Sequence, residues 1–137
     1  MKTAIFISIF LVVAAGILFS HGNVTPQLVD TTGLDNVGEE WLETNPYRGN
    51  KLAAEIGSSG YNQNCARCHG LEAISGGIAP DLRKLPTDDT GDIIYMDRVR
   101  NGYSQNGAYK MPPFENLLSQ EAMWAIREFL FTKAIPE

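Results

Sequence analysis

An apolar repeat at helical spacing marks the C-terminal part of this chain. Apolar side chains recur there at intervals of three and four residues, which predicts a helix with one buried face. We expect this helix to open at Ser119 and to end near Thr132. The residues of its predicted buried face are Leu118, Ala122, Ile126, Phe129 and Leu130.

Two further helices are expected upstream. One begins at Pro46 or Asn50 and runs to Ser59, since proline is tolerated in the first turn of a helix. The other covers residues 91–102, with Asp89 or Thr90 as its cap. Residues 70–91 are rich in glycine and proline and are predicted to form a loop. We find no strand pattern, internal repeat or second domain, so the predicted fold class is all-α.

The first 22 residues differ from the rest of the chain. A short positive end is followed by an uncharged apolar run from Ala4 to Phe19. This run is shorter than the roughly 20 residues that a membrane-spanning helix needs, and small residues near Gly22 suit a cleavage site. We interpret residues 1–22 as a signal peptide, with a retained membrane anchor as the alternative. Either interpretation predicts export to the periplasm, and cleavage predicts no membrane association afterwards.

Residues 23–45 form a predicted acidic arm before the domain at residues 46–137. Its acidic residues have no Lys or Arg among them, which is typical of a solvated surface. Trp41 is a candidate anchor of the arm to the domain. The whole chain has a formal net charge of −5, which argues against a nucleic-acid partner because a polyanion needs a basic face. The acidic residues of the arm are Asp30, Asp35, Glu39, Glu40 and Glu43.

The segment GYNQNCARCHG, residues 60–70, contains both cysteines of the chain, followed at once by a histidine. A thioredoxin-like redox pair should follow a buried strand, but the preceding residues have helical spacing. A zinc site needs three or four ligands, and the second histidine, His21, lies in the signal region. In an exported protein, C-x-x-C-H is the signature of covalent haem attachment. We therefore expect one haem c, bonded to Cys65 and Cys68 with His69 on the iron; zinc and a structural disulfide are the alternatives.

The ligand on the other face of the haem would decide the function. An open iron site suits an enzyme, whereas a methionine opposite the histidine raises the potential and suits an electron carrier. Met96 and Met123 fall at helical spacing with apolar neighbours and are expected in the core. Met111 precedes Pro112 and Pro113, which exclude a regular helix. We predict Met111, on this stiffened loop, as the sixth ligand.

Over residues 46–134 the chain resembles the class I cytochromes c. The resemblance lies in a glycine and an aromatic residue at four-residue steps before the first cysteine, here Gly57, Tyr61 and Cys65, and in Phe129-Leu130. It implies three to four helices wrapped around one covalently bound haem, with Gly57 at a close crossing of the first and last helices. It also implies that the carbonyl of Pro80 accepts a hydrogen bond from His69. Ala79 departs from the glycine usual before that proline.

The phrases YNQNCARCHGLEAISGGIAPDLRKLP and RVRNGYSQNGAYKMPPF are similar to the cytochrome c-550 group that serves PQQ-dependent alcohol dehydrogenases. This resemblance implies a one-electron carrier, not an enzyme. It would accept electrons from a PQQ-dependent alcohol or methanol dehydrogenase and pass them to a downstream cytochrome or oxidase. The alternatives are a carrier for another dehydrogenase or for a terminal oxidase, and a haem enzyme with an open iron site. Residues that could contact a partner near the haem edge are Ala73, Ile74, Ile78, Pro112 and Pro113.

Overall fold

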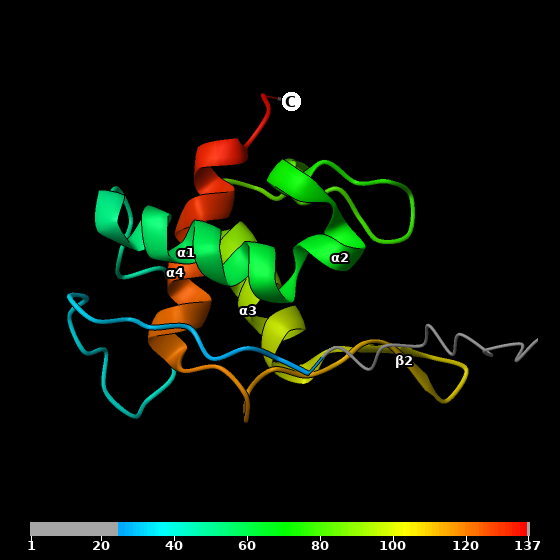
Figure 1. Ribbon diagram of the computed structural model, residues 1–137, viewed down its shortest axis with the longest axis horizontal. Helices are drawn as coiled ribbons and strands as arrows, with labels where there is room; N and C mark the ends of the chain where they lie inside the picture. Colours follow the sequence, from blue (N-terminus) through cyan, green and yellow to red (C-terminus); the bar gives the residue numbers. More distant parts are fainter. Residues whose placement is uncertain (1–24, 137) are drawn as a thin grey trace, which may run out of the picture.

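Four α-helices carry most of the regular structure in residues 25–136, the part of the chain that this computed structural model describes (Figure 1). The predicted all-α class is confirmed, whereas the predicted signal peptide lies outside the described residues. None of the helices in the described part is long and apolar enough to cross a bilayer. The helical elements are α1 (Lys51–Asn64), α2 (Ala66–His69), α3 (Asp89–Asn101) and α4 (Gln120–Lys133), with two short 3₁₀ helices, η1 (Leu71–Ala73) and η2 (Leu82–Lys84).

Polar side chains fix where the long helices begin. Asn50 caps α1 by accepting a hydrogen bond from the Ala53 N–H at 3.1 Å. Asp88 caps α3, one residue before the predicted positions, and Ser119 caps α4 as expected. Each cap satisfies a backbone N–H that has no partner within the helix. The predicted end of the first helix at Ser59 was wrong, because α1 continues to Asn64 and only Cys65 separates it from α2.

The crossing of α1 over α4 organises the core, as Figure 1 shows. Gly57 lies at the closest approach, where an added Cβ would be 1.8 Å from the carbonyl oxygen of Ala125. One turn later the rings of Tyr61 and Phe129 pack with their centroids 5.1 Å apart. The close crossing implied by the resemblance is therefore present, and it depends on the absence of a side chain at residue 57.

A small antiparallel hairpin follows α3, formed by β1 (Tyr103–Gln105) and β2 (Ala108–Met111). The expectation of no strands was wrong here. Asn106 and Gly107 both have positive φ, at 52° and 76°. Positive φ at both central residues is what the tight turn of a two-residue hairpin requires. Nearly all side chains of the two strands are exposed, so the alternating pattern that reveals a half-buried strand is missing from the sequence.

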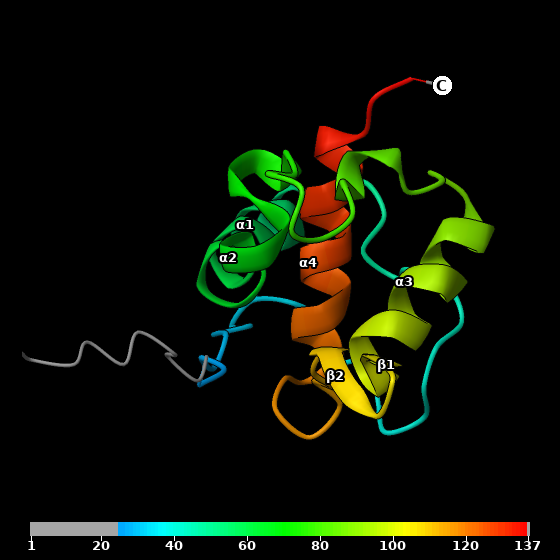
Figure 2. The same cartoon turned by 90° about the vertical axis from the view of Figure 1, so that its right-hand side faces the viewer.

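The acidic arm packs on the helices instead of extending into solvent. The backbone N–H of Leu42 donates to the Gln120 side chain at 2.8 Å. Trp41 is half-buried, and the Arg100 guanidinium lies 4.1 Å from the centre of its ring. Figure 2 shows the later part of the arm, in cyan, beside α3. Trp41 is thus one of several contacts that hold the arm.

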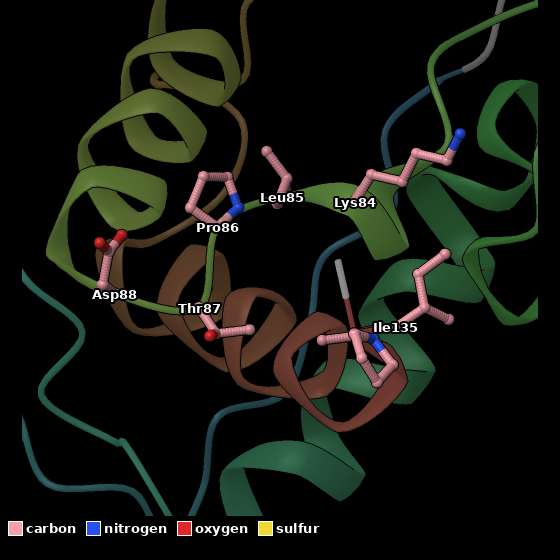
Figure 3. A pocket seen from close by; sticks show the side chains of 8 residues that line it. Lys84, Leu85, Pro86, Thr87, Asp88 and Ile135 are labelled. Atoms are coloured by element: carbon pink, nitrogen blue, oxygen red, sulfur yellow. The ribbon is translucent and has the colours of Figure 1, made fainter.

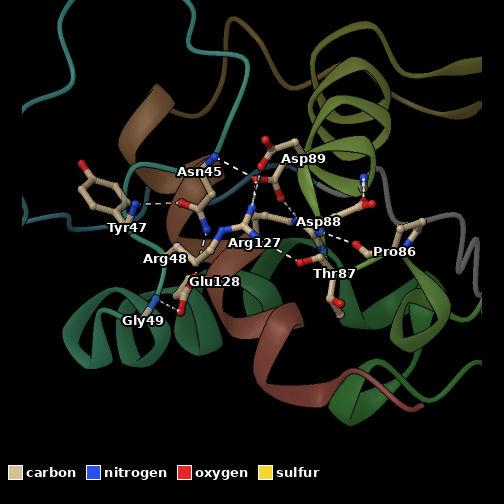
Figure 4. Close-up of polar contacts among 12 residues, drawn as sticks. Asn45, Tyr47, Arg48, Gly49, Pro86, Thr87, Asp88, Asp89, Arg127 and Glu128 are labelled. Atoms are coloured by element: carbon tan, nitrogen blue, oxygen red, sulfur yellow. Dashed lines mark hydrogen bonds and ion pairs between the residues drawn. The ribbon is translucent and has the colours of Figure 1, made fainter. Parts of the chain in front are cut away.

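A buried ionic cluster joins the end of the arm to α3 and α4 (Figure 4). Asp92 and Arg127 are each 1% exposed, and Arg127 Nε donates to Asp92 Oδ1 at 2.7 Å. The backbone N–H of Asn45 donates to the other oxygen of Asp92 at 2.9 Å. The Asn45 amide donates to Glu128 at 3.0 Å, and burial raises the pKa of this glutamate. The cluster fixes three elements that are distant in sequence against one another.

Candidate haem-binding site

The cysteine motif forms the short helix α2 and the residue before it. The backbone N–H groups of Cys68 and His69 both donate to the Cys65 carbonyl, at 3.1 and 3.0 Å. This turn brings both cysteines and the histidine into one short helical segment. Cys65 is half-buried and Cys68 is exposed, and both thiols are free. The predicted alternative of a structural disulfide is therefore not what the structure shows.

The Cys65 thiol does not resemble a reactive thiolate. Burial, and after it the neighbouring Cys68, raise the pKa of Cys65 to about 12. Cysteines that act as nucleophiles or redox centres need a lowered pKa. The motif also follows helix α1 and not a buried strand, which argues against thioredoxin-like chemistry.

His69 uses one ring nitrogen for a hydrogen bond that orients its ring. The residue is 8% exposed, and its Nδ1 lies 2.9 Å from the carbonyl oxygen of Pro80. A carbonyl oxygen only accepts hydrogen bonds, so Nδ1 carries a proton, and in the neutral imidazole Nε2 then keeps its lone pair. A histidine that binds a metal usually donates its other N–H in this way. The structure thus brings Pro80 to His69, as the resemblance implied.

Met111 lies on a different element from the cysteine motif, at the end of β2. It is partly buried and packs against the hydrophobic core. Gly102 has φ +71°, and an added Cβ there would lie 2.5 Å from the Met111 carbonyl oxygen. The backbone around Met111 is therefore held close to the end of α3. By contrast, Met96 and Met123 are buried at 5% and 0% exposure, as expected of core residues.

The donor set fits haem c better than a metal ion held by side chains alone. In the described part of the chain, no group of three or more His, Cys, Asp or Glu side chains could hold a metal ion. The zinc alternative therefore has no support there. Two free thiols in one turn, with a histidine whose Nε2 lone pair is available, are what covalent haem attachment requires.

The open cavity in Figure 3 is separate from these residues. It lies between the segment that follows η2 and the C-terminal residues 134–136. Its lining contains no cysteine, histidine or methionine, so it offers no ligand for haem iron. The labelled lining residues are Lys84, Leu85, Pro86, Thr87, Asp88 and Ile135.

Comparison with known proteins identifies the family. Residues 52–130 match the family model described as cytochrome c oxidase, cbb3-type, subunit III. Cytochrome c550 of Pseudomonas aeruginosa is 54% identical over 136 residues, which covers 93% of this chain and 94% of that protein. The chain belongs to the c-type cytochromes. This cytochrome therefore carries one covalently bound haem c and is an electron-transfer protein, not an enzyme.

Parts of two quinone-dependent alcohol dehydrogenases are also similar to this cytochrome. Quinohemoprotein alcohol dehydrogenase ADH-IIG of Pseudomonas putida is 34% identical over 83 residues, 58% of this chain but only 10% of that protein. The dehydrogenase subunit of the alcohol dehydrogenase (quinone) of Gluconobacter oxydans is 34% identical over 74 residues, 54% of this chain and 9% of that protein. No solved structure matches significantly.

The sequence identified Tyr61 only as the aromatic residue of the family motif and gave no role to its hydroxyl. This hydroxyl donates to the carbonyl oxygen of Gly70, directly after His69, at 2.7 Å. Burial is the main cause that raises the pKa of Tyr61 well above its usual value. A tyrosine and a phenylalanine are alike in a hydrophobic pattern, so nothing in the spacing distinguishes this role.

Proposed function

We propose that Cys65 and Cys68 form the two thioether bonds to the haem, and that His69 and Met111 bind the iron from opposite faces. The observation that supports this most directly is the 2.9 Å contact between His69 Nδ1 and the Pro80 carbonyl, which leaves Nε2 as the ligand atom. A bound haem iron supplies one-electron chemistry by cycling between its ferric and ferrous states. A methionine on the second face would close the iron to other ligands and raise the potential, as suits a carrier.

The same proposal includes export to the periplasm by a signal peptide at residues 1–22. It is supported by the uncharged run from Ala4 to Phe19 after a positive end. The mature protein would consist of the acidic arm at residues 23–45 and the cytochrome domain at residues 46–137. N-terminal sequencing of the protein purified from periplasm tests the cleavage site, which we expect after Gly22.

We propose a PQQ-dependent alcohol dehydrogenase, oxidising an alcohol such as ethanol or methanol, as the electron donor, and a downstream cytochrome or oxidase as the acceptor. The two quinone-dependent relatives support this donor, because each has a segment similar to this cytochrome within an alcohol dehydrogenase polypeptide. The matched family model favours a second candidate, in which the partner is a terminal oxidase.

Exposed apolar side chains after the attachment motif provide a surface for such a partner. Ile74 and Ile78 are 53% and 81% exposed, and Leu71 is 71% exposed. A carrier that must dock and leave needs a small interface with a modest apolar centre. Ala73, by contrast, is fully buried, so its expected part in docking was wrong. The contact surface we propose consists of Leu71, Ile74 and Ile78.

Stopped-flow reduction by a purified PQQ alcohol dehydrogenase tests the partner. We expect the oxidised cytochrome to be reduced rapidly, and Ile78→Lys to slow this reduction without changing the spectrum. Leu28→Lys is the matched control, because Leu28 is 87% exposed but lies on the arm. If no enzyme of this kind reduces the wild type, the donor is wrong while the carrier function stands. Equal rates for the two variants would refute the proposed contact surface.

A further inference from the structure

The chain makes an unusual turn directly after the haem-attachment motif. Glu72 and Ala73 have φ values of 55° and 61°, and Gly70 has φ 82°. The left-handed region is natural for glycine but costs other L-residues roughly 1–2 kcal/mol each. Two consecutive residues in this region persist only where the surrounding structure holds them. The contacts that hold the turn are therefore informative.

A single hydroxyl from α1 holds the inner side of this turn. Tyr61 is fully buried, and its hydroxyl donates to the Gly70 carbonyl oxygen at 2.7 Å. The hydroxyl therefore ties the first residue of the turn to α1. Its own position is fixed because the Tyr61 ring packs against Phe129 of α4.

An ion pair holds the outer side of the turn. The Glu72 carboxylate lies 2.5 Å from Lys133 Nζ at the end of α4, with the two side chains 56% and 32% exposed. A partly exposed pair of this kind contributes little to stability. The buried hydroxyl is thus the principal contact, and the ion pair adds to it.

Along the chain, the turn lies between His69 and Pro80, the two residues whose relative position matters for the iron. Gly70 follows His69 directly, and the loop that begins there returns to His69 at Pro80, whose carbonyl accepts from Nδ1 at 2.9 Å. This hydrogen bond orients the imidazole and raises its basicity as a ligand. A more basic ligand favours ferric over ferrous iron and so lowers the potential. A group that fixes Gly70, at the start of this loop, therefore influences the potential of the haem.

We propose that the Tyr61 hydroxyl is a positioning group: it holds the turn at residues 70–73 and thereby keeps His69 in its hydrogen bond to Pro80, which sets the haem potential. This inference rests on the proposed role of His69 as an iron ligand. A phenylalanine at this position would preserve the ring packing between α1 and α4. The proposed role therefore belongs to one oxygen atom, which a conservative substitution removes.

Tyr61→Phe in the holoprotein is the direct test. Without the hydroxyl, the Gly70 carbonyl loses a buried partner. We expect amide hydrogen exchange in residues 70–74 to become roughly tenfold faster, since the loss of one buried hydrogen bond corresponds to about this factor. We also expect the His69 Nδ1–H of the reduced protein to exchange faster in NMR spectra. The midpoint potential should shift upwards, because the imidazole becomes a weaker donor to the iron.

Tyr47→Phe is the matched control. Tyr47 is also buried, and its hydroxyl also donates to a backbone carbonyl, that of Asp35 in the arm. This variant should lose comparable stability while leaving the potential and the exchange of residues 70–74 unchanged. If the role of Tyr61 were merely structural, Tyr61→Phe would, like Tyr47→Phe, leave the potential and the exchange of residues 70–74 unchanged. Equal potentials for Tyr61→Phe and the wild type would overturn the proposal, whatever happens to the melting temperature.

A second variant covers the case in which Tyr61→Phe does not mature with haem. Glu72→Gln removes the ion pair to Lys133 from an exposed position and should fold. Because the exposed ion pair adds little to stability, exchange in residues 70–74 should change by much less than about tenfold; an acceleration of about tenfold or more would show that the ion pair, and not the hydroxyl, holds the turn, and would overturn the proposal. A wild-type spectrum without a histidine-ligated iron would instead refute the proposed function itself, so the two failures are distinguishable.

Discussion

Replacing Gly57 by alanine tests the helix crossing on which the fold depends. An added Cβ would lie 1.8 Å from the Ala125 carbonyl oxygen, 2.4 Å from its carbonyl carbon and 2.9 Å from the Ile126 nitrogen. All three atoms belong to the backbone of α4, so no side chain can rotate out of the way. Restoring ordinary contact at 3.4 Å requires the two helices to separate by about 1.6 Å at this point.

The change in the free energy of unfolding caused by Gly57→Ala is the balance of two opposing effects. Alanine favours a helix interior over glycine by about 1 kcal/mol. Overpacking in a rigid core typically costs about 1–3 kcal/mol and occasionally more, and a backbone clash belongs at the upper end. Separating the helices also weakens the packing of Tyr61 on Phe129, because these rings meet one turn away. We expect a net loss of about 3 kcal/mol in the free energy of unfolding.

Thermal unfolding of the holoprotein, followed by far-UV circular dichroism, measures this loss. A loss of this size should lower the melting temperature by at least about 10 °C. Gly60→Ala is the matched control in the same helix, because its Cβ would meet only side-chain atoms of Val29 and Ile126, at 3.0–3.3 Å. That variant should melt within about 4 °C of the wild type. If the two variants melt together, the close crossing does not stabilise the fold as argued.

Three further predictions follow from the structure. In a urea titration, Asp92→Asn should lower the free energy of unfolding by about 3–5 kcal/mol, because it removes the buried carboxylate that pairs with both Arg127 and Arg48; Asp89→Asn, whose side chain is 75% exposed in its pair with Arg48, should cost less than about 1 kcal/mol in the same titration. The hydrogen bond from Arg83 lowers the pKa of Asp81 to about 2 from its ordinary value of 3.8. The stability that this hydrogen bond adds to the fold is therefore present above pH 3.8 and is lost as the pH falls through 2. The difference in melting temperature between the wild type and Asp81→Asn should therefore shrink over this range, and a constant difference would contradict the assignment. Replacing Cys65 and Cys68 together with alanine should leave no haem attached after denaturation, as judged by haem staining of a denaturing gel; haem that stays bound would refute the thioether assignment.

Much of the fold could be predicted because its determinants are local in the sequence. The apolar repeat and Ser119 identified α4 and its start. The C-x-x-C-H segment identified the attachment motif without reference to any other part of the chain. The roles of Gly57 and Pro80 could be predicted only from the family resemblance. Gly57 approaches Ala125, which is distant in sequence, and no sequence pattern indicates the contact between Pro80 and His69.

The features that were missed depend on contacts that the sequence pattern does not encode. The hairpin at residues 103–111 forms because Asn106 and Gly107 favour its turn, while its exposed strands carry no alternation. The arm was expected to be solvated, yet its acidic composition gives no sign that Asn45 reaches the buried carboxylate of Asp92. The hydroxyl of Tyr61 is likewise invisible to any argument from hydrophobic spacing.

The iron ligation of the oxidised protein tests the central claim most directly. A histidine–methionine haem shows a weak sulfur-to-iron absorption band near the red end of the visible spectrum. We predict that the wild type shows this band, that Met111→Leu abolishes it and opens the iron to cyanide, and that Met96→Leu and Met123→Leu retain it, since both residues are buried core positions. A band that survives in Met111→Leu, or that disappears in either of the other two variants, would contradict the proposed ligands.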